Sequence, residues 1–363
     1  MSAATSESYN AVRFAKPGTD HVESYFLKAT SPDATRALWL KATIFSAASE
    51  PGRAVAEGWA IAFDHRAPER CNVAVKSSVP IDQARFGRSG LDIAWNDPDS
   101  GDSLHMVPGM CSGAITMRGR TIRWKLSSTG PARPLVLFPY EWMYRGPWPS
   151  SKTVTPYPDL RVAGELEVDG QHWEIADWRG MQGHNWGRGH ADSYAWCHCN
   201  QWDEPVDLVL EAVSARVRLG KLLVPALSAI RMRLDGRDCA LNGLLQLVGT
   251  RSEVSLRRYT FSARSAQARL QGLFEAPAED FVGLYYPSPQ GHMTHCLNSK
   301  LGRGRIRLEL RGRAPIELRT QAAALEIGTR RTDHGVRMHV CRCPGSHAGA
   351  GQRWPEPTTG ANP

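Results

Sequence analysis

The chain has 363 residues, a hydrophobic content of 42% and a formal net charge of +8. At about 150 residues per domain this length predicts two domains. No apolar run of about 18 residues occurs, which excludes a transmembrane helix. The N-terminus lacks the basic start and apolar segment of a cleaved signal, so a cytoplasmic location is expected.

The basic residues concentrate in the second half, where they mostly alternate with apolar residues. In the stretch from Arg303 to Arg307, for example, arginines occupy every second position. This spacing is typical of the solvent-exposed face of a strand. Aromatic residues are not interleaved with the arginines, so nucleic-acid binding is not expected. A peripheral contact with an acidic membrane surface stays open.

Strand-like segments dominate the chain from its N-terminus to its C-terminus. They are short, alternate in polarity and are separated by Gly, Pro and Asp turns, a pattern that predicts an all-β protein built of sandwiches or barrels. The predicted strands cover residues 22–30, 37–46, 57–64, 72–78, 112–117, 121–127, 160–168, 172–181, 206–213, 259–263, 268–274, 305–310 and 316–327.

A change in composition marks a domain boundary within residues 140–158, which are rich in proline and aromatic residues. Repeated proline does not belong in a central strand. We therefore predict one domain over residues 1–150 and a second over residues 151–343. Residues 344–363 contain many Gly and Pro and few hydrophobic residues, which predicts a disordered tail.

Residues 181–200 are the densest in chemical groups, with three His, two Trp and two Cys. The glycines at 183, 187 and 189 predict a turn, and the alternation that follows predicts a strand over residues 194–202. One face of this strand carries Tyr194, Trp196, His198 and Asn200. Such a face suits the wall of a mostly apolar pocket, although ordinary core packing would use the same aromatic residues.

The eight cysteines are too sparse for a disulfide scaffold. The pairs Cys197/Cys199 and Cys341/Cys343 have C-x-C spacing, whereas structural zinc sites use C-x₂₋₄-C pairs. No metal site is therefore expected. The chain also lacks a phosphate loop, a Rossmann fingerprint and a G-x-S-x-G nucleophile motif, so no cofactor is expected either.

A second polar strand face is predicted near the C-terminal end of the chain. It comprises His292, Thr294, Cys296, Asn298 and Lys300 at alternate positions. The face either contacts solvent or lines the same interior as the strand face around Trp196, and the sequence leaves both interpretations open.

Two segments resemble a known family. The residues His184-Asn185-Trp186-Gly187, with Trp196 and Cys199-Asn200 after them, resemble the N-W-G, W and C-N signature of tocopherol cyclase. That family is related to the carotenoid hydratases of the hydroxyneurosporene synthase type. The segment Glu23-Ser24-Tyr25-Phe26 is similar to the E-G-W-Y-F-K opening of the same superfamily, although it lacks the Trp.

The resemblance implies two tandem lipocalin-like β-barrel domains that enclose a lipophilic, isoprenoid-like molecule, with one of the two segments in each domain. His184 stands where the cyclases have Lys, and residues 188–192 also depart from the cyclase pattern. A hydratase, a cyclase and an isomerase therefore remain open as activities. A non-catalytic carrier of a hydrophobic ligand is the alternative.

Acid-initiated carbocation chemistry needs an acid that an apolar site keeps protonated at pH 7. Asp192 is the first candidate, and His184 and His190 are the competing donors. The faces of Trp186 and Trp196 would stabilise the cation. The remaining residues expected to contact the substrate are Tyr25, Asn185, Tyr194, His198 and Asn200. The structural alternatives are that Asn185 closes a turn and that Asp192 begins a strand.

Overall fold

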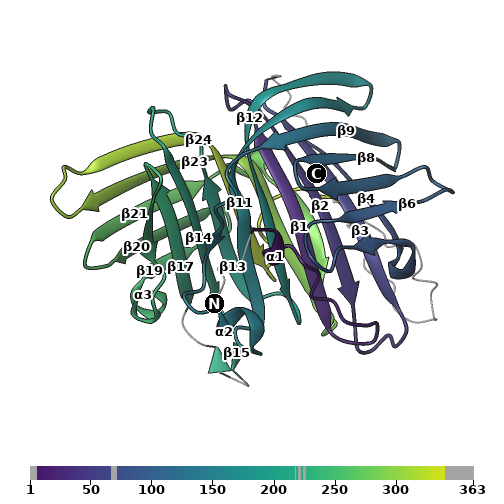
Figure 1. Ribbon diagram of the computed structural model, residues 1–363, viewed down its shortest axis with the longest axis horizontal. Coiled ribbons are helices and arrows are strands. Elements are labelled where there is room, and N and C mark those ends of the chain that lie inside the picture. Colours follow the sequence, from purple (N-terminus) through teal and green to yellow (C-terminus); the bar gives the residue numbers. More distant parts are fainter. Residues whose placement is uncertain (1–5, 67–71, 217, 220–221, 224–225, 340–363) are drawn as a thin grey trace, which may run out of the picture.

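The computed structural model describes residues 6–66, 72–216, 218–219, 222–223 and 226–339. These residues form two large, curved sheets that lie side by side (Figure 1) and are antiparallel except for the parallel pairing of β22 with β25. The arrangement confirms the all-β prediction with two tandem lipocalin-like units. None of the helices in the described ranges is long and apolar enough to cross a membrane.

The first sheet has twelve strands in the described part of the chain, in the order β4-β3-β2-β1-β12-β11-β9-β8-β7-β6-β5, with β10 paired to β11. Its strands are β1 (His21–Thr30), β2 (Arg36–Ser46), β3 (Ala54–Asp64), β4 (Val73–Pro80), β5 (Arg85–Phe86), β6 (Ile93–Asn96), β7 (Ser103–Val107), β8 (Met110–Met117), β9 (Arg120–Thr129), β10 (Leu135–Val136), β11 (Ser151–Val168) and β12 (Gln171–Gly187).

The second sheet has the order β18-β17-β14-β13-β24-β23-β21-β20-β19, with β22 on β23 and β25 on β22. Its strands are β13 (Ser193–Cys199), β14 (Leu208–Arg216), β17 (Leu227–Leu234), β18 (Arg237–Leu241), β19 (Arg251–Val254), β20 (Arg258–Arg264), β21 (Ala268–Glu275), β22 (Val282–Pro287), β23 (Met293–Leu310), β24 (Ile316–Thr329) and β25 (Met338–His339). A small separate hairpin pairs β15 (Arg218–Leu219) with β16 (Leu222–Leu223).

Helical segments in the described ranges are short. They are α1 (Ser6–Tyr9), α2 (Trp142–Arg145) and α3 (Leu244–Gly249), with 3₁₀ turns η1 (Ile81–Gln83) and η2 (Ala278–Asp280).

The prediction of a turn beginning at Gly183 was wrong, because β12 continues through Gly187. At Gly183 the backbone of β12 lies close to a side chain of the neighbouring strand β1. A Cβ atom at this position would lie 2.4 Å from Cζ of Phe26 on the neighbouring strand. A glycine within a strand often marks such an approach. The following strand also ends earlier than predicted, at Cys199.

The change from one sheet to the other falls between Gly187 and Ser193, whereas the predicted domain boundary lies at residues 150/151. β11 contains Pro156 and Pro158, yet it pairs with both β12 and β9. Its ladder with β12 shows register shifts in this region, and such irregularities accommodate residues that cannot donate a backbone hydrogen bond. The predicted disordered tail over residues 344–363 lies outside the described residues.

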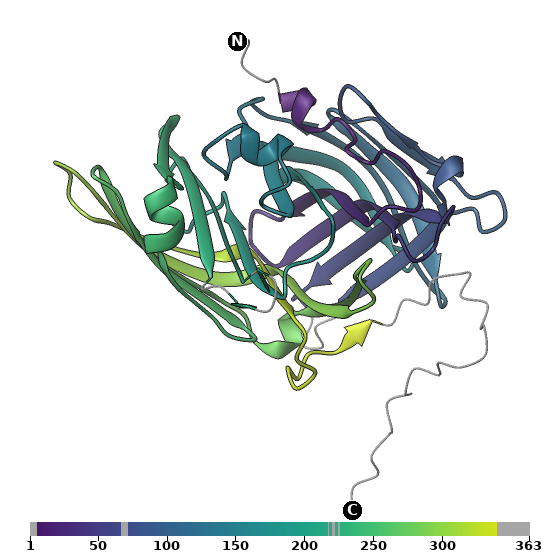
Figure 2. The ribbon, with the colours of Figure 1, turned by 90° about the horizontal axis from the view of Figure 1, so that it is seen from below.

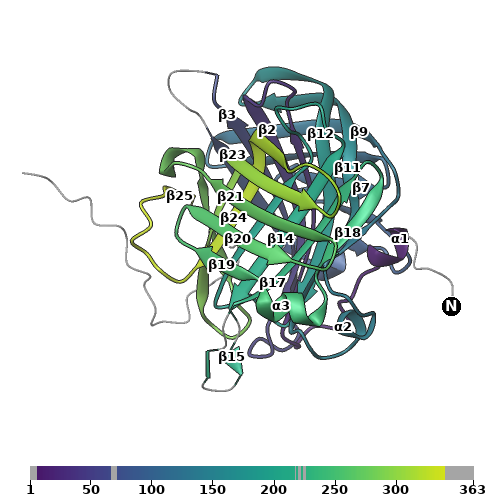
Figure 3. The ribbon, with the colours of Figure 1, turned by 90° about the vertical axis from the view of Figure 1, so that its left-hand side faces the viewer.

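The core divides into three main clusters. One lies on the concave side of the first sheet and includes Trp124 and Trp173, and a second lies within the second sheet and includes Phe261 and Phe274. The third contains side chains from both sheets, among them Trp39, Trp59, Trp196 and Tyr286. Figures 2 and 3 show the two curved sheets packed against each other, and this inter-sheet cluster fills the contact.

Candidate functional site

Of the residues that carry the family resemblance, Glu23–Phe26 and His184–Gly187 are neighbours in the first sheet, whereas Trp196 and Cys199 lie on β13 of the second sheet. β1 and β12 pair antiparallel, so Glu23 lies opposite Trp186 and Tyr25 lies opposite His184. Residues 23–26 and 184–187 therefore belong to one sheet. Glu23 and His184 are 161 residues apart in the sequence, and only the pairing of β12 with β1 brings them together.

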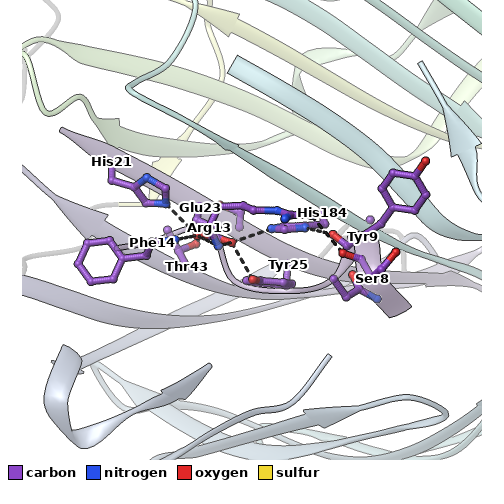
Figure 4. Close-up of polar contacts among 12 residues, drawn as sticks. Ser8, Tyr9, Arg13, Phe14, His21, Glu23, Tyr25, Thr43 and His184 are labelled. Carbon is purple, nitrogen blue, oxygen red and sulfur yellow. Dashed lines mark hydrogen bonds and ion pairs between the residues drawn. The ribbon is translucent and has the colours of Figure 1, made fainter. Parts of the chain in front are cut away.

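Glu23 is the centre of a buried polar cluster next to α1 (Figure 4). Its carboxylate accepts hydrogen bonds from His184 Nε2 at 2.9 Å, His21 Nε2 at 2.8 Å and Tyr25 Oη at 2.7 Å. The backbone N–H groups of residues 13 and 14 also donate to it. Burial alone would raise the pKa of Glu23, but the hydrogen bonds from His184 and His21 outweigh burial and lower it well below its usual range.

His184 has an acceptor on each ring nitrogen. Nδ1 lies 2.6 Å from the carbonyl oxygen of Tyr9, and Nε2 lies 2.9 Å from the Glu23 carboxylate. Neither acceptor carries a proton, so only the doubly protonated ring satisfies both contacts. The ring is stacked on Tyr25, with 4.1 Å between centroids, and lies 4.7 Å from Trp186.

The cluster around Glu23 therefore attaches the N-terminal segment to the first sheet. In this arrangement His184 has no N–H left for a ligand, and Tyr25 donates its hydroxyl proton to Glu23. These contacts favour a structural role for His184 and Tyr25 over the predicted contact with substrate.

The β13 face with Tyr194, Trp196, His198 and Asn200 points toward the first sheet. The opposite face of the strand packs into the core of the second sheet. Trp196 contacts Phe26 edge-on, with 5.9 Å between ring centroids, and Asn200 Oδ1 accepts a hydrogen bond of 3.1 Å from Lys28. The four residues thus share one face, as predicted, and this face lies between the two sheets.

The second predicted polar face, on β23, is also directed at the inter-sheet contact. Asn298 and Lys300 are fully buried. Lys300 Nζ lies 2.6 Å from Asn298 Oδ1 and 2.9 Å from a carboxylate oxygen of Glu326 on β24. The ammonium group also lies 4.4 Å from the ring centroid of Trp39 in the first sheet. This row of side chains is therefore part of the interior and not a solvent-exposed surface.

Lys41 on β2 adds a second buried cation to the inter-sheet contact. Its Nζ lies 4.0 Å from the ring centroid of Tyr286 and 5.5 Å from that of Trp39. Burial lowers the pKa of Lys41 to about 8. His190 is stacked on Tyr286 at 5.2 Å, and burial together with Lys41 lowers the pKa of His190 to about 3. His190 is therefore neutral at pH 7 and is a poor proton donor.

Glu211 on β14 is a buried carboxyl group that the sequence analysis missed. It lies opposite His198 on the neighbouring strand and so shares the inter-sheet face. Trp196 Nε1 donates to its Oε1 at 2.8 Å, and Thr155 Oγ1 of the first sheet lies 2.7 Å from its Oε2. Burial raises the pKa of Glu211 to about 7. A single carboxylate within the apolar run Leu208–Val213 is the sequence signal that could have identified it.

Asp192 lies outside this cluster. Its carboxylate forms an ion pair of 2.6 Å with Arg330, and its side chain is partly exposed. The ion pair with Arg330 and the distance from the inter-sheet aromatic residues disfavour the predicted role of Asp192 as the catalytic acid. Asn185 lies within β12 rather than in a turn, paired with Ser24 and Thr153.

The cysteines of the C-x-C pair in β13 pack in the core of the second sheet. Cys197 and Cys199 are fully buried, and burial raises the pKa of Cys199 to about 11. Within the described residues, no three or more His, Cys, Asp and Glu side chains are grouped so that they could hold a metal ion. The second C-x-C pair, Cys341/Cys343, lies outside the described residues.

A cavity of about 1060 Å³ opens elsewhere, at one end of the second sheet. Its lining is rich in serine and arginine, including Ser214, Arg257 and Arg303. None of the inter-sheet aromatic residues lines this cavity, so it is separate from the cluster around Glu211.

Comparison with known proteins finds similarity to one family over part of the chain. Residues 159–329 match the family model described as tocopherol cyclase-like. The uncharacterized protein Rv0493c of Mycobacterium tuberculosis is 28% identical over 313 residues, which cover 86% of this chain and 87% of that protein.

Two solved structures are similar to this one. The crystal structure of CghA with Sch210972 has a TM-score of 0.56 and 12% sequence identity, and the match covers 90% of this chain and 95% of that chain. Kievitone hydratase from Nectria haematococca has a TM-score of 0.48 and 10% identity over 88% of this chain and 94% of that chain. The likeness to CghA shows a shared fold across both sheets. Residues 159–329 thus resemble the tocopherol cyclase-like family, in agreement with the resemblance seen in residues 184–187, and the chain as a whole shares its fold with CghA.

Proposed function

We propose that the protein is a cofactor-independent enzyme that protonates an alkene of a lipophilic, isoprenoid-like molecule, with Glu211 as the acid. The observation that carries the proposal is the pKa of about 7 that burial gives this carboxyl group. An acid for this chemistry must stay protonated near neutral pH, and desolvation is the usual way to achieve it.

The environment of Glu211 suits the reaction that would follow. Its proton moves to one alkene carbon, and a tertiary carbocation and the Glu211 carboxylate result. The ring face of Trp196 would stabilise the cation by about 0.5–2 kcal/mol. The Nε1–H of Trp196 already donates to Glu211 and would stabilise the new carboxylate.

The cation can then react in three ways. Addition of water gives a tertiary alcohol, attack by a hydroxyl group of the same molecule gives a cyclic ether, and loss of a neighbouring proton gives an isomer. In each case one proton is released and Glu211 takes it back. The match of residues 159–329 to the tocopherol cyclase-like family supports this class of chemistry, and CghA, which has a similar fold, has been crystallised with Sch210972.

The first experiment identifies the ligand and the reaction. Purified protein is extracted with organic solvent and the extract is analysed by mass spectrometry. The protein is then incubated with geranylgeraniol and with a prenylated quinol. A product heavier by one water indicates a hydratase, and an isomeric product indicates a cyclase or isomerase. Ligand binding with no product on any substrate recovered from the extract supports a carrier and contradicts the enzyme proposal.

Glu211→Gln tests the acid directly. Glutamine keeps an acceptor for Trp196 and a partner for Thr155, so we expect unchanged affinity and a loss of turnover of about 10²–10⁴-fold. Turnover of the wild type should fall as the pH rises through about 7, because Glu211 loses its proton there. The matched control is Asp192→Asn, which should retain activity because Asp192 is paired with Arg330. Full turnover in the Glu211→Gln variant would exclude Glu211 as the acid.

A further inference from the structure

Exposed hydrophobic side chains are concentrated in two short segments. The two most exposed are Leu245 and Val248 on α3, at 85% and 75%, and Trp142 on α2 is exposed at 53%. Of the seven large hydrophobic side chains exposed in the described ranges, six lie in or beside α2 and α3: Tyr140, Trp142, Trp148, Leu244, Leu245 and Val248. The seventh, Met110, begins β8 in the first sheet.

The two segments form one surface. Met143 of α2 and Leu247 of α3 pack in the same buried cluster with Leu137 and Ala229. Figures 1 and 3 place α2 and α3 at the same end of the molecule. The rings of residues 140, 142 and 148 stack in sequence, with centroid separations of 6.2 and 6.1 Å. We refer to the six exposed side chains as the α2–α3 surface.

We propose that the α2–α3 surface docks on a phospholipid bilayer that contains anionic lipids. Contiguous exposed apolar side chains on a soluble protein mark an interaction site. Trp and Tyr favour the membrane–water interface, and the side chains of Leu245 and Val248 are placed to enter the acyl region.

Charge favours an anionic membrane as the partner. The chain has a formal net charge of +8. Arg251 follows α3 and is exposed, and the backbone carbonyl of Arg264, also exposed, accepts a hydrogen bond from the side chain of Gln246 of α3. Basic residues beside an inserted apolar surface add electrostatic attraction to anionic headgroups.

The same surface adjoins the site around Glu211. Val213 packs both against the cluster beneath α2 and α3 and against the inter-sheet cluster that contains Trp196. It lies on β14 two residues after Glu211, on the same face of the strand. A lipophilic molecule that leaves the bilayer here would therefore pass Val213 on its way to Glu211. This last step rests on the proposed function, whereas membrane docking does not.

Vesicle flotation with the full chain tests the docking. The probe is a vesicle of phosphatidylcholine and phosphatidylglycerol in about equal parts, and a phosphatidylcholine vesicle is the comparison. We expect the wild type to float with the anionic vesicles and the double variant Leu245→Ser/Val248→Ser to bind at least about tenfold more weakly. Met110→Ser, which removes an exposed hydrophobic side chain in the first sheet, should bind as the wild type does.

Three outcomes would overturn the proposal: no flotation of the wild type, equal loss in the Met110→Ser variant, or a wild-type dimer that the double variant abolishes. The last result, seen by analytical ultracentrifugation, would assign the surface to a second copy of the chain. Both substituted residues are exposed, so the thermal unfolding midpoint should not change. Flotation of the Glu211→Gln variant should equal that of the wild type, which separates a failure of docking from a failure of the proposed reaction.

Discussion

Glu23 remains charged in the interior of the first sheet because five donor groups surround its two oxygens. Glu211 has two polar contacts, and burial dominates its pKa. The pKa of a glutamate side chain is thus lowered at one site of this protein and raised at the other. The difference follows from the number of donors that replace the lost water.

His184→Ala tests the role of the Glu23 cluster in stability. The substitution leaves a buried carboxylate without its charged partner, so the free energy of unfolding should fall by about 3–5 kcal/mol at pH 7. Urea denaturation measures the change. His172→Ala is the control, because His172 is exposed and its loss should change stability by less than about 0.5 kcal/mol. Equal effects of the two substitutions would show that the cluster contributes little to stability.

At the level of the strand, simple alternation predicted much of the structure correctly. Every segment predicted as a strand lies largely within a strand, and on β23 Arg303, Arg305 and Arg307 are exposed while Ile306 and Leu308 are buried. The error at Gly183 has a physical origin. Whether a glycine makes a turn or permits a close approach depends on the residue facing it, and Phe26 lies far away in the sequence.

Gly183→Ala should destabilise the pairing of β1 with β12. The new methyl group would lie 2.4 Å from the Phe26 ring, and overpacking of this kind costs about 1–3 kcal/mol. Gly249→Ala is the matched control because no atom lies within 4 Å of the added Cβ. Thermal unfolding of both variants checks the prediction. A second variant, Gly183→Ala/Phe26→Leu, should recover part of the lost stability, and no recovery would show that the Phe26 ring is not the cause.

At the scale of the whole molecule, the candidate site depends on contacts that the sequence does not reveal. The alternation in residues 194–202 predicts that Trp196 and His198 share one face, but nothing in this pattern shows that the face meets the first sheet. Thr155 and Lys28, which complete the contact, come from strands distant in the chain. The pKa of Glu211 depends on that contact, since packing of the two sheets removes water from its carboxyl group.

The first sheet should not be stable without the second. A fragment of residues 1–190 contains every strand of the first sheet but exposes Trp39, Trp59 and Phe26, which the second sheet helps to bury in the whole chain. We expect this fragment to bind the dye ANS and to self-associate in size-exclusion chromatography, because so large an apolar face favours association. A fragment of residues 1–150 lacks β11 and β12 and should show less sheet by circular dichroism. A monomeric 1–190 fragment that unfolds cooperatively and binds no dye would show that the two sheets are independent domains.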